Sequence, residues 1–155
     1  MEFDTNYKKI NLIGEAQYLK NENSFFYEPW NNVDFSIIIG NSYSSLDVKL
    51  SNMKVVQLTG FNSKDNWIEK KIDVPKAMTG ELLIKGKQGD FCTGSGIHCE
   101  ETWETYYNPD NGWICIGNYE YCKTGQAVKF ANNTVAVIKG TKLWAIWINP
   151  KFIEE

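Results

Sequence analysis

The chain contains no arginine, and its 16 basic residues are all lysines. It therefore lacks the guanidinium groups that form paired hydrogen bonds with phosphates, carboxylates and guanine bases. The lysines are dispersed along the sequence, whereas nucleic-acid binding normally requires a basic face. We expect no nucleic-acid partner.

Long apolar runs are missing too. None approaches the ~20 residues that a membrane-spanning helix needs, and the first residues, MEFDTNYKKINLIGEAQYL, lack the apolar core of a signal peptide. We therefore expect a cytoplasmic protein with no membrane partner, whose cysteines stay reduced. The 155 residues fit one domain, 1–155, large enough to form a core without disulfides or metals.

One segment lacks lysine as well. Residues 88–122 hold six acidic residues and no lysine, so their formal charge is −6, against −3 for the whole chain. The segment also contains the four cysteines, the single histidine and seven aromatic residues: Phe91, Trp103, Tyr106, Tyr107, Trp113, Tyr119 and Tyr121. Acidic charge steers a basic protein toward a surface, and aromatic rings supply desolvated contact area. The alternative interpretation is a hairpin whose rings face the core and whose acids are solvated.

Strand alternation divides the centre of this segment between two faces. It predicts Glu100, Glu104 and Tyr106 on one face. Glu101, Trp103 and Tyr107 take the other. Trp103 and Trp113 are candidate anchors that a partner would bury. The predicted partner-binding residues are Glu100, Glu101, Trp103, Glu104, Tyr106, Tyr107, Asp110, Trp113 and Glu120.

The cysteines and the histidine do not form a recognisable catalytic or metal motif. Cys92 and Cys99, and then Cys115 and Cys122, are spaced as Cys-x6-Cys, whereas structural zinc usually takes Cys-x2-4-Cys. His98 could act as a base for a cysteine nucleophile, but the sequence shows no third residue that would orient the imidazole. The glutamates do not form two carboxylates facing each other across a cleft, as glycoside hydrolysis needs. We expect no catalytic residue, no metal and no cofactor, and therefore a protein that is not an enzyme.

Hydrophobic periodicity predicts strands throughout. Apolar alternation or β-branched runs occur at 35–39, 47–51, 54–58, 68–74 and 81–85. Short helices are conceivable at 6–11 and 75–79. Roughly ten closely spaced strands are typical of a sandwich or barrel. We predict an all-β or β-dominated single domain, an antiparallel sandwich or barrel with at most short helices.

The C-terminal third gives the clearest strand signals. Strands are expected at 127–130, 134–139 and 143–148, with a turn at 131–133. Gly140-Thr141 suits a two-residue hairpin loop of type II′, with glycine first. The last two strands are apolar on both faces, which predicts a central position covered on both sides.

Three stretches of the C-terminal part carry a resemblance: YNPDNGWICIG at 107–117, AVKFANNTVAV at 127–137 and LWAIWINP at 143–150. They lie within residues 107–150, somewhat under a third of the chain, and they resemble small immunity proteins of bacterial toxin systems, including contact-dependent inhibition. The similarity lies in an acidic, β-rich chain that ends in a strand pair and a Trp-x-x-Pro close. It implies a toxin partner, often a cationic nuclease, which is neutralised by tight binding.

The charge pattern and the resemblance agree on a function. We expect a non-enzymatic immunity protein that binds and neutralises a cognate, basic nuclease toxin domain as a monomer in a 1:1 complex. The alternative is a carbohydrate-binding β-sandwich module, because six Trp and eight Tyr residues could form a sugar-stacking platform. Such modules mostly work outside the cell, which the N-terminal residues do not suggest. A small enzyme is the third possibility.

Overall fold

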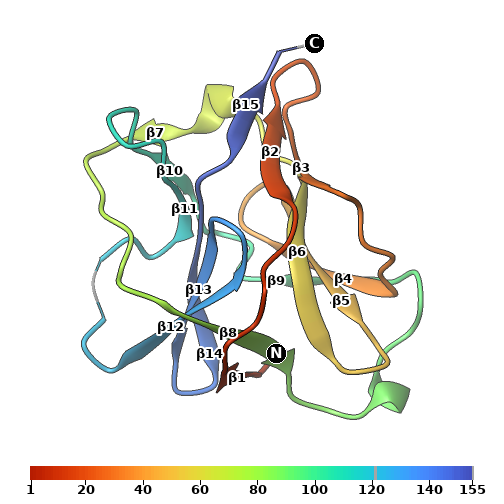
Figure 1. Ribbon diagram of the computed structural model, residues 1–155. Coiled ribbons are helices and arrows are strands. Elements are labelled where there is room, and N and C mark those ends of the chain that lie inside the picture. Colours follow the sequence, from red (N-terminus) through yellow and green to blue (C-terminus); the bar gives the residue numbers. More distant parts are fainter. Residues whose placement is uncertain (121, 155) are drawn as a thin grey trace.

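Short strands make up most of the computed structural model, which describes residues 1–120 and 122–154 (Figure 1). Strands hold 51% of the residues and helical turns 4%, so the predicted β-dominated fold class is confirmed. The strands are β1 (Phe3–Tyr7), β2 (Glu15–Leu19), β3 (Ser24–Glu28), β4 (Phe35–Ile39), β5 (Tyr43–Lys49), β6 (Lys54–Phe61), β7 (Ile68–Glu69), β8 (Met78–Ile84), β9 (Gly96–Cys99), β10 (Thr105–Tyr107), β11 (Ile114–Gly117), β12 (Gly125–Ala131), β13 (Thr134–Lys139), β14 (Lys142–Ile148) and β15 (Lys151–Ile153). Two single 3-10 turns are η1 (Lys64–Asn66) and η2 (Gln88–Asp90). No helix among the described residues is long and apolar enough to span a bilayer.

The strands join into one curled, mixed sheet that forms a half-barrel. Its main path runs β15-β2-β3-β6-β8-β12-β13-β14-β11-β10-β7. A branch leaves β6 through β5 and β4 to β9, and β1 pairs with β8. Among the described strands, four pairings are parallel: β15–β2, β4–β9, β12–β8 and β10–β7. The sheet therefore differs from the expected antiparallel arrangement.

Aromatic side chains bring the two ends of the curled sheet together. Phe152 on β15 lies 6.2 Å, ring centre to ring centre, from Trp67 and 5.9 Å from Tyr107 on β10. Tyr18 on β2 joins them, 4.8 Å from Trp67. The Trp67 indole donates a 2.9 Å hydrogen bond to Asn62 Oδ1. No pairing joins the backbones of the end strands β15 and β7 in the described sheet. The packing of this aromatic cluster therefore connects the two ends.

Two apolar clusters lie on opposite faces of the β11–β14–β13 region. The inner one takes alternate residues from nearly every strand and includes Ile146 and Ile148. The second contains Ile72, Cys115, Val135, Val137, Ala145 and Trp147. Because neighbouring residues of a strand face opposite ways, Trp147 and Ile148 belong to different clusters. The prediction of a central hairpin covered on both sides is confirmed.

The second cluster is covered by a segment that the sequence pattern assigns incorrectly. A strand is expected at 68–74, but pairing ends at Glu69, and residues 70–77 form no strand. Ile72 is still buried. Its carbonyl accepts hydrogen bonds from the side-chain amides of Asn108 (2.9 Å) and Asn111 (3.1 Å). Side-chain donors therefore satisfy this backbone in place of a neighbouring strand.

Other local expectations also fail. Neither predicted helix forms, because β1 takes residues up to Tyr7 and β8 begins at Met78. The strand expected at 47–51 is the end of β5, which starts at Tyr43 and stops at Lys49. The turn at 131–133 is confirmed, since Ala131 pairs with Thr134 across a two-residue loop.

The β13–β14 loop supports a first prediction. Lys139 pairs with Lys142 across Gly140-Thr141, and Gly140 has φ +65° while Thr141 has no positive φ, as a type II′ turn requires. Gly140→Ala should destabilise the protein by about 1 kcal/mol, because a Cβ is strained in this conformation. Urea unfolding measures the change. Gly89→Ala is the matched control: its Cβ also meets open space, but its φ is ordinary, so we expect less than about 0.5 kcal/mol. Equal losses in both variants would contradict the turn assignment.

Candidate functional site

The structure divides the predicted aromatic residues between the two sides of β10. Trp103 and Tyr107 pack against the inner cluster. Tyr106 and Trp113 pack against the second cluster. All four are half-buried, so each ring contributes to the core as well as to the surface. Tyr121 lies outside the described residues.

The predicted acidic residues are all exposed, but they do not share one strand face. Glu100 has φ +54°, and a turn at 101–102 separates β9 from β10. This left-handed residue breaks the alternation expected across 100–107. Glu101 lies beside His98, with Oε1 3.5 Å from Nδ1. Asp110 lies in the turn after β10, where its backbone N–H donates to Asn108 Oδ1.

Glu104 and Tyr106 do lie together, as predicted. The Tyr106 hydroxyl donates a 3.3 Å hydrogen bond to Glu104 Oε2. Burial, followed by the neighbouring Glu104 charge, raises the pKa of the Tyr106 phenol. The Tyr106 ring meets the Tyr119 ring edge-on at 4.7 Å between centres, and the Lys70 ammonium lies 4.9 Å from the centre of the Tyr119 ring.

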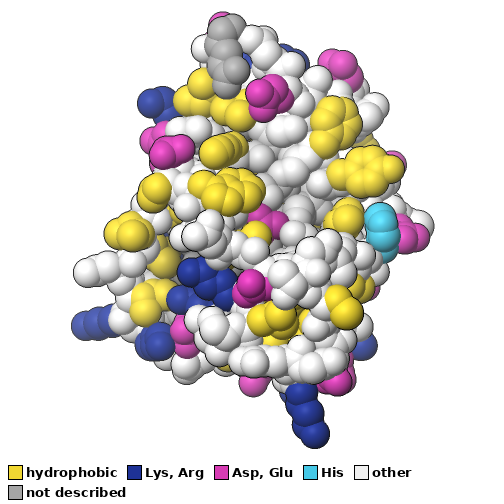
Figure 2. Space-filling view, turned by 90° about the vertical axis from the view of Figure 1, so that its right-hand side faces the viewer, with side chains coloured by type: hydrophobic (Ala, Val, Ile, Leu, Met, Phe, Trp, Pro, Cys, Tyr) yellow, Lys and Arg dark blue, Asp and Glu magenta, His cyan; other side chains and the backbone are white. Residues whose placement is uncertain are grey.

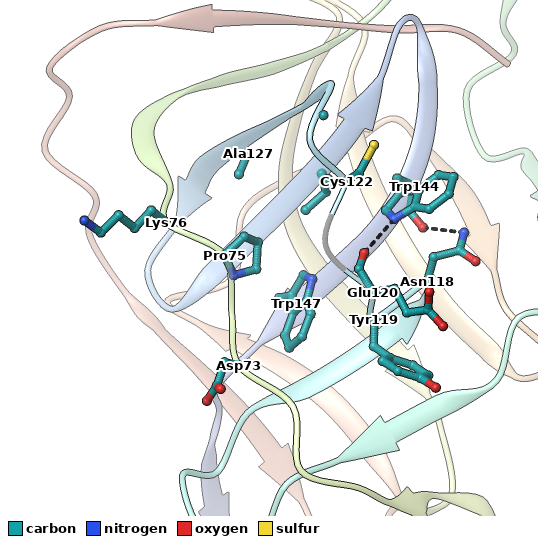
Figure 3. Close-up of a pocket in the computed structure, with 12 residues that line it drawn as sticks. Asp73, Pro75, Lys76, Asn118, Tyr119, Glu120, Cys122, Ala127, Trp144 and Trp147 are labelled. Atoms are coloured by element: carbon teal, nitrogen blue, oxygen red, sulfur yellow. Dashed lines mark hydrogen bonds between the residues drawn. The ribbon is translucent and has the colours of Figure 1, made fainter.

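Tyr119 also lines a cavity of about 180 Å³ (Figure 3). Its walls come from three parts of the chain: residues 73–76, residues 118–120 with Cys122, and strands β12 to β14. Pro75, Cys122, Trp144 and Trp147 surround the space, and the Lys76 side chain points away from it (Figure 3). The cavity is therefore lined by apolar and polar groups in about equal measure.

Trp144 holds one wall of the cavity in place. Its indole N–H donates to the Glu120 carbonyl at 3.2 Å. Its own carbonyl accepts from the backbone N–H and the side-chain amide of Asn118 at 3.1 and 3.0 Å. The Lys139 ammonium lies 5.0 Å from the centre of the Trp144 ring. These contacts fix residues 118–120 against β14.

A β-bulge explains why both tryptophans line the same cavity. Strict alternation places residues 144 and 147 on opposite faces of a strand. The β13–β14 register, however, passes from Val137–Ala145 to Ile138–Leu143, which leaves Trp144 as an extra residue. Bulges re-aim side chains in this way. We call Asp73, Glu104, Tyr106, Tyr119, Glu120 and Trp144 the acidic–aromatic surface. Of these, Asp73, Tyr119 and Trp144 were not in the predicted set, because only tertiary packing brings them to Glu104 and Glu120.

The cysteines are free thiols in different surroundings. Burial raises the pKa of the Cys115 thiol strongly, and it raises that of Cys99. Cys122 lines the cavity, and its Sγ lies 3.5 Å from Thr124 Oγ1. That hydrogen bond is the main reason why the pKa of the Cys122 thiol is lowered.

These differences predict the order of alkylation. A lowered pKa leaves more thiolate at neutral pH, so iodoacetamide should modify Cys122 faster than Cys99 and should spare Cys115 in the folded protein. Below the pKa of Cys122 its rate should fall about tenfold for each pH unit, because only the thiolate reacts. Peptide mapping by mass spectrometry gives the rates, and urea should make all four thiols reactive. Rapid modification of native Cys115, or fewer than four thiols in urea without reductant, would contradict this.

Comparisons with known proteins leave the site to be interpreted from its geometry. No protein-family model matches the chain, and no curated protein matches it either. Within residues 1–120 and 122–154, no group of three or more His, Cys, Asp or Glu side chains is placed to hold a metal ion. What the geometry offers is exposed carboxylates and half-buried rings around a cavity with both apolar and polar walls.

Proposed function

We propose that the protein is a non-enzymatic immunity protein that binds and neutralises a basic toxin domain, such as a nuclease, in the cytoplasm. One observation carries this proposal: contacts link Glu104 through Tyr106 and Tyr119 to a cavity bordered by Asp73 and Glu120. Charged residues at the rim and aromatic residues at the centre are typical of protein interfaces. The partner class follows from the acidic charge and from the immunity-protein resemblance.

The cavity suits a single anchoring side chain from the partner. Interface hot spots fill well-packed pockets, and neighbouring contacts exclude water from them. A cavity of about 180 Å³ exceeds the roughly 150 Å³ that admits benzene in an engineered protein core. The surrounding carboxylates would pair with the Lys and Arg residues that a nuclease uses to hold phosphate. Occupation of those residues would block the toxin in a 1:1 complex.

The protein's own lysines illustrate the contacts that we expect from the partner. Lys70 and Lys139 place ammonium groups over the rings of Tyr119 and Trp144. Cation–π contacts of this kind contribute about 0.5–1 kcal/mol at exposed sites. Lys70 and Lys76 reduce the negative charge locally, so we expect the basic groups of the partner to pair with Glu104 and Glu120.

Charge reversal tests the proposal. Glu104→Lys together with Glu120→Lys should slow association with the toxin domain encoded by a neighbouring gene by about tenfold, because steering by charge acts mainly on the on-rate. Added salt should slow the wild type in the same way. Stopped-flow fluorescence measures the rate.

A matched control separates local from global charge. Glu15→Lys together with Glu22→Lys changes the net charge equally, but at exposed positions on β2 and in the turn that follows it. We expect a much smaller effect on association. Equal slowing by both pairs would show that only net charge matters, and it would remove the acidic–aromatic surface from the interface.

A further inference from the structure

A second surface lies on the outer face of β3, β6, β5 and β4, and it shares no residue with the acidic–aromatic surface. The register arranges it in rows across β5 and β6: Tyr43 opposite Phe61, Ser45 opposite Thr59, and Asp47 opposite Gln57. The alternate residues of the same strands, such as Leu46 and Leu58, belong to the inner core. The face is therefore the outer side of the sheet, with exposed aromatic residues at one end and largely buried polar residues along its length.

Asp47 is the centre of the polar part. Its side chain is only 2% exposed, although it lies on the outer face. Its carboxylate accepts four hydrogen bonds, from Ser36 (2.8 Å), Ser45 (2.7 Å), Gln57 (2.9 Å) and Thr59 (2.7 Å). Among the described residues, no lysine or histidine forms an ion pair with it. Neutral donors alone satisfy this buried charge.

This network determines what the face can offer a ligand. The hydroxyl groups of Ser36, Ser45 and Thr59 donate their hydrogens to Asp47. Thr59 is buried, so the serine oxygens are the ones that a ligand could reach, and they can only accept. The Gln57 carbonyl is taken by the backbone N–H and the side-chain amide of Asn31, at 3.3 and 3.0 Å. Ser36 and Ser45 are half-exposed. A ligand on this floor must therefore donate hydrogen bonds.

Exposed aromatic rings border the floor on two sides. Tyr43 is 63% exposed and Phe61 46% exposed at the end of the rows. Along the β3 side, Trp30 is 52% exposed and meets Phe26 edge-on at 5.4 Å. Figure 2 looks onto the side where β4 and β5 lie in Figure 1, and it shows separate hydrophobic groups with polar surface between them. Such rings offer apolar faces to a ligand.

The charges near the floor argue against a cationic ligand. Beyond the Asp47–Gln57 row, the same strands place Lys49 opposite Lys54. Lys54 pairs with Glu81 at 3.6 Å, and none of the described ion pairs includes Lys49. The carboxylate of Asp47 is buried beneath its donors. A basic peptide would therefore meet ammonium groups at one end of the face. The exposed carboxylate on the same side of β3, Glu28, lies outside the rows of β5 and β6.

We propose that this face binds a neutral oligosaccharide. Sugar hydroxyl groups supply the donors that the acceptor-only floor requires, and the apolar C–H faces of pyranose rings suit Trp30, Tyr43 and Phe61. A neutral ligand suits these rows, because their carboxylate, Asp47, already accepts four hydrogen bonds. The rows from Tyr43 to Asp47 span roughly 13 Å at the usual rise per strand residue, so the face is long enough for more than one sugar ring. The inference does not depend on the proposed toxin binding.

Affinity gel electrophoresis with soluble neutral polysaccharides tests this inference. We expect the mobility of the full chain to fall in gels that contain at least one of xyloglucan, mixed-linkage β-glucan and galactomannan. Calorimetry with the matching hexasaccharide then gives the affinity. Trp30→Ala and Tyr43→Ala should each weaken binding by about tenfold, the size of one lost aromatic contact. Both side chains are largely exposed, so the variants should fold.

Controls make each outcome decisive. Tyr7→Ala removes an exposed aromatic residue from β1 and should leave sugar binding unchanged. The Glu104→Lys, Glu120→Lys variant should also bind sugar like the wild type, which separates this test from that of toxin binding. Normal mobility in all three gels would overturn the inference. So would equal losses in Tyr7→Ala and Trp30→Ala, or binding of a hexa-arginine peptide to this face in place of the sugars.

Discussion

Replacing Asp47 with alanine should destabilise the protein by about 3 kcal/mol, because several buried donors lose their acceptor at once. Four side chains on β4, β5 and β6 donate to this one carboxylate. In Asp47→Ala the hydroxyl groups can turn toward other acceptors, but the Gln57 amide is fully buried, and Asp47 is its acceptor among the described residues. Urea unfolding, followed by tryptophan fluorescence, measures the loss.

Two further variants should lose less stability than Asp47→Ala, because each disrupts only part of the hydrogen-bond network. Ser36→Ala removes one donor of the four and should cost about 1 kcal/mol, the net value of one hydrogen bond. Asp47→Asn keeps one acceptor oxygen but points an amide N–H₂ at existing donors, so its loss should lie between the other two. If Asp47→Ala were as stable as Ser36→Ala, the network would not be what holds the outer sheet face.

Truncating Tyr119 should weaken toxin binding by about 2 kcal/mol or more, as loss of an interface hot spot does. Tyr119 contacts Tyr106 and Lys70, and it borders the cavity. It is half-buried, so a partner can cover the rest of its ring. The affinity of Tyr119→Ala for the toxin domain, measured by calorimetry, tests this.

The matched variant is Tyr119→Phe, which keeps the ring. We expect it to bind within about threefold of the wild type, since it retains the apolar contact area. Because Tyr119 also packs against the second cluster, thermal unfolding must show that Tyr119→Ala is folded at the temperature of measurement. A folded Tyr119→Ala with wild-type affinity would exclude the ring as an anchor.

The central hairpin was predictable from sequence because its signal is local. Residues 134–148 are apolar on both faces, and Gly140-Thr141 supplies the turn between the strands. The segment at 68–74 has an equally regular pattern, yet only Ile68 and Glu69 pair. Whether a strand forms depends on a free neighbouring edge, and the Asn108 and Asn111 amides take the Ile72 carbonyl instead. No pattern within the segment reveals those distant donors.

The candidate site was predictable in its charges but not in its shape. Glu104 and Glu120 are exposed, as acidic residues usually are, but the fold also brings Lys70, Lys76 and Lys139 from other segments to their surface. Trp144 reaches the cavity only because of a bulge, which depends on the pairing of two strands. From the sequence, Asp47 is expected to be a solvated residue at the start of the strand predicted at 47–51. Its burial follows from four donors on three strands, which only the folded sheet brings together.

Co-expression in bacteria tests the central claim most directly. A toxin domain encoded beside this gene should stop growth on its own, and the wild-type protein should restore it. The Glu104→Lys, Glu120→Lys variant should restore growth less well at equal expression, and the Glu15→Lys, Glu22→Lys control should restore it fully. Full protection by the folded Glu104→Lys, Glu120→Lys variant would move the interface elsewhere. A wild-type protein that neither binds the toxin nor rescues growth would contradict the proposed function itself.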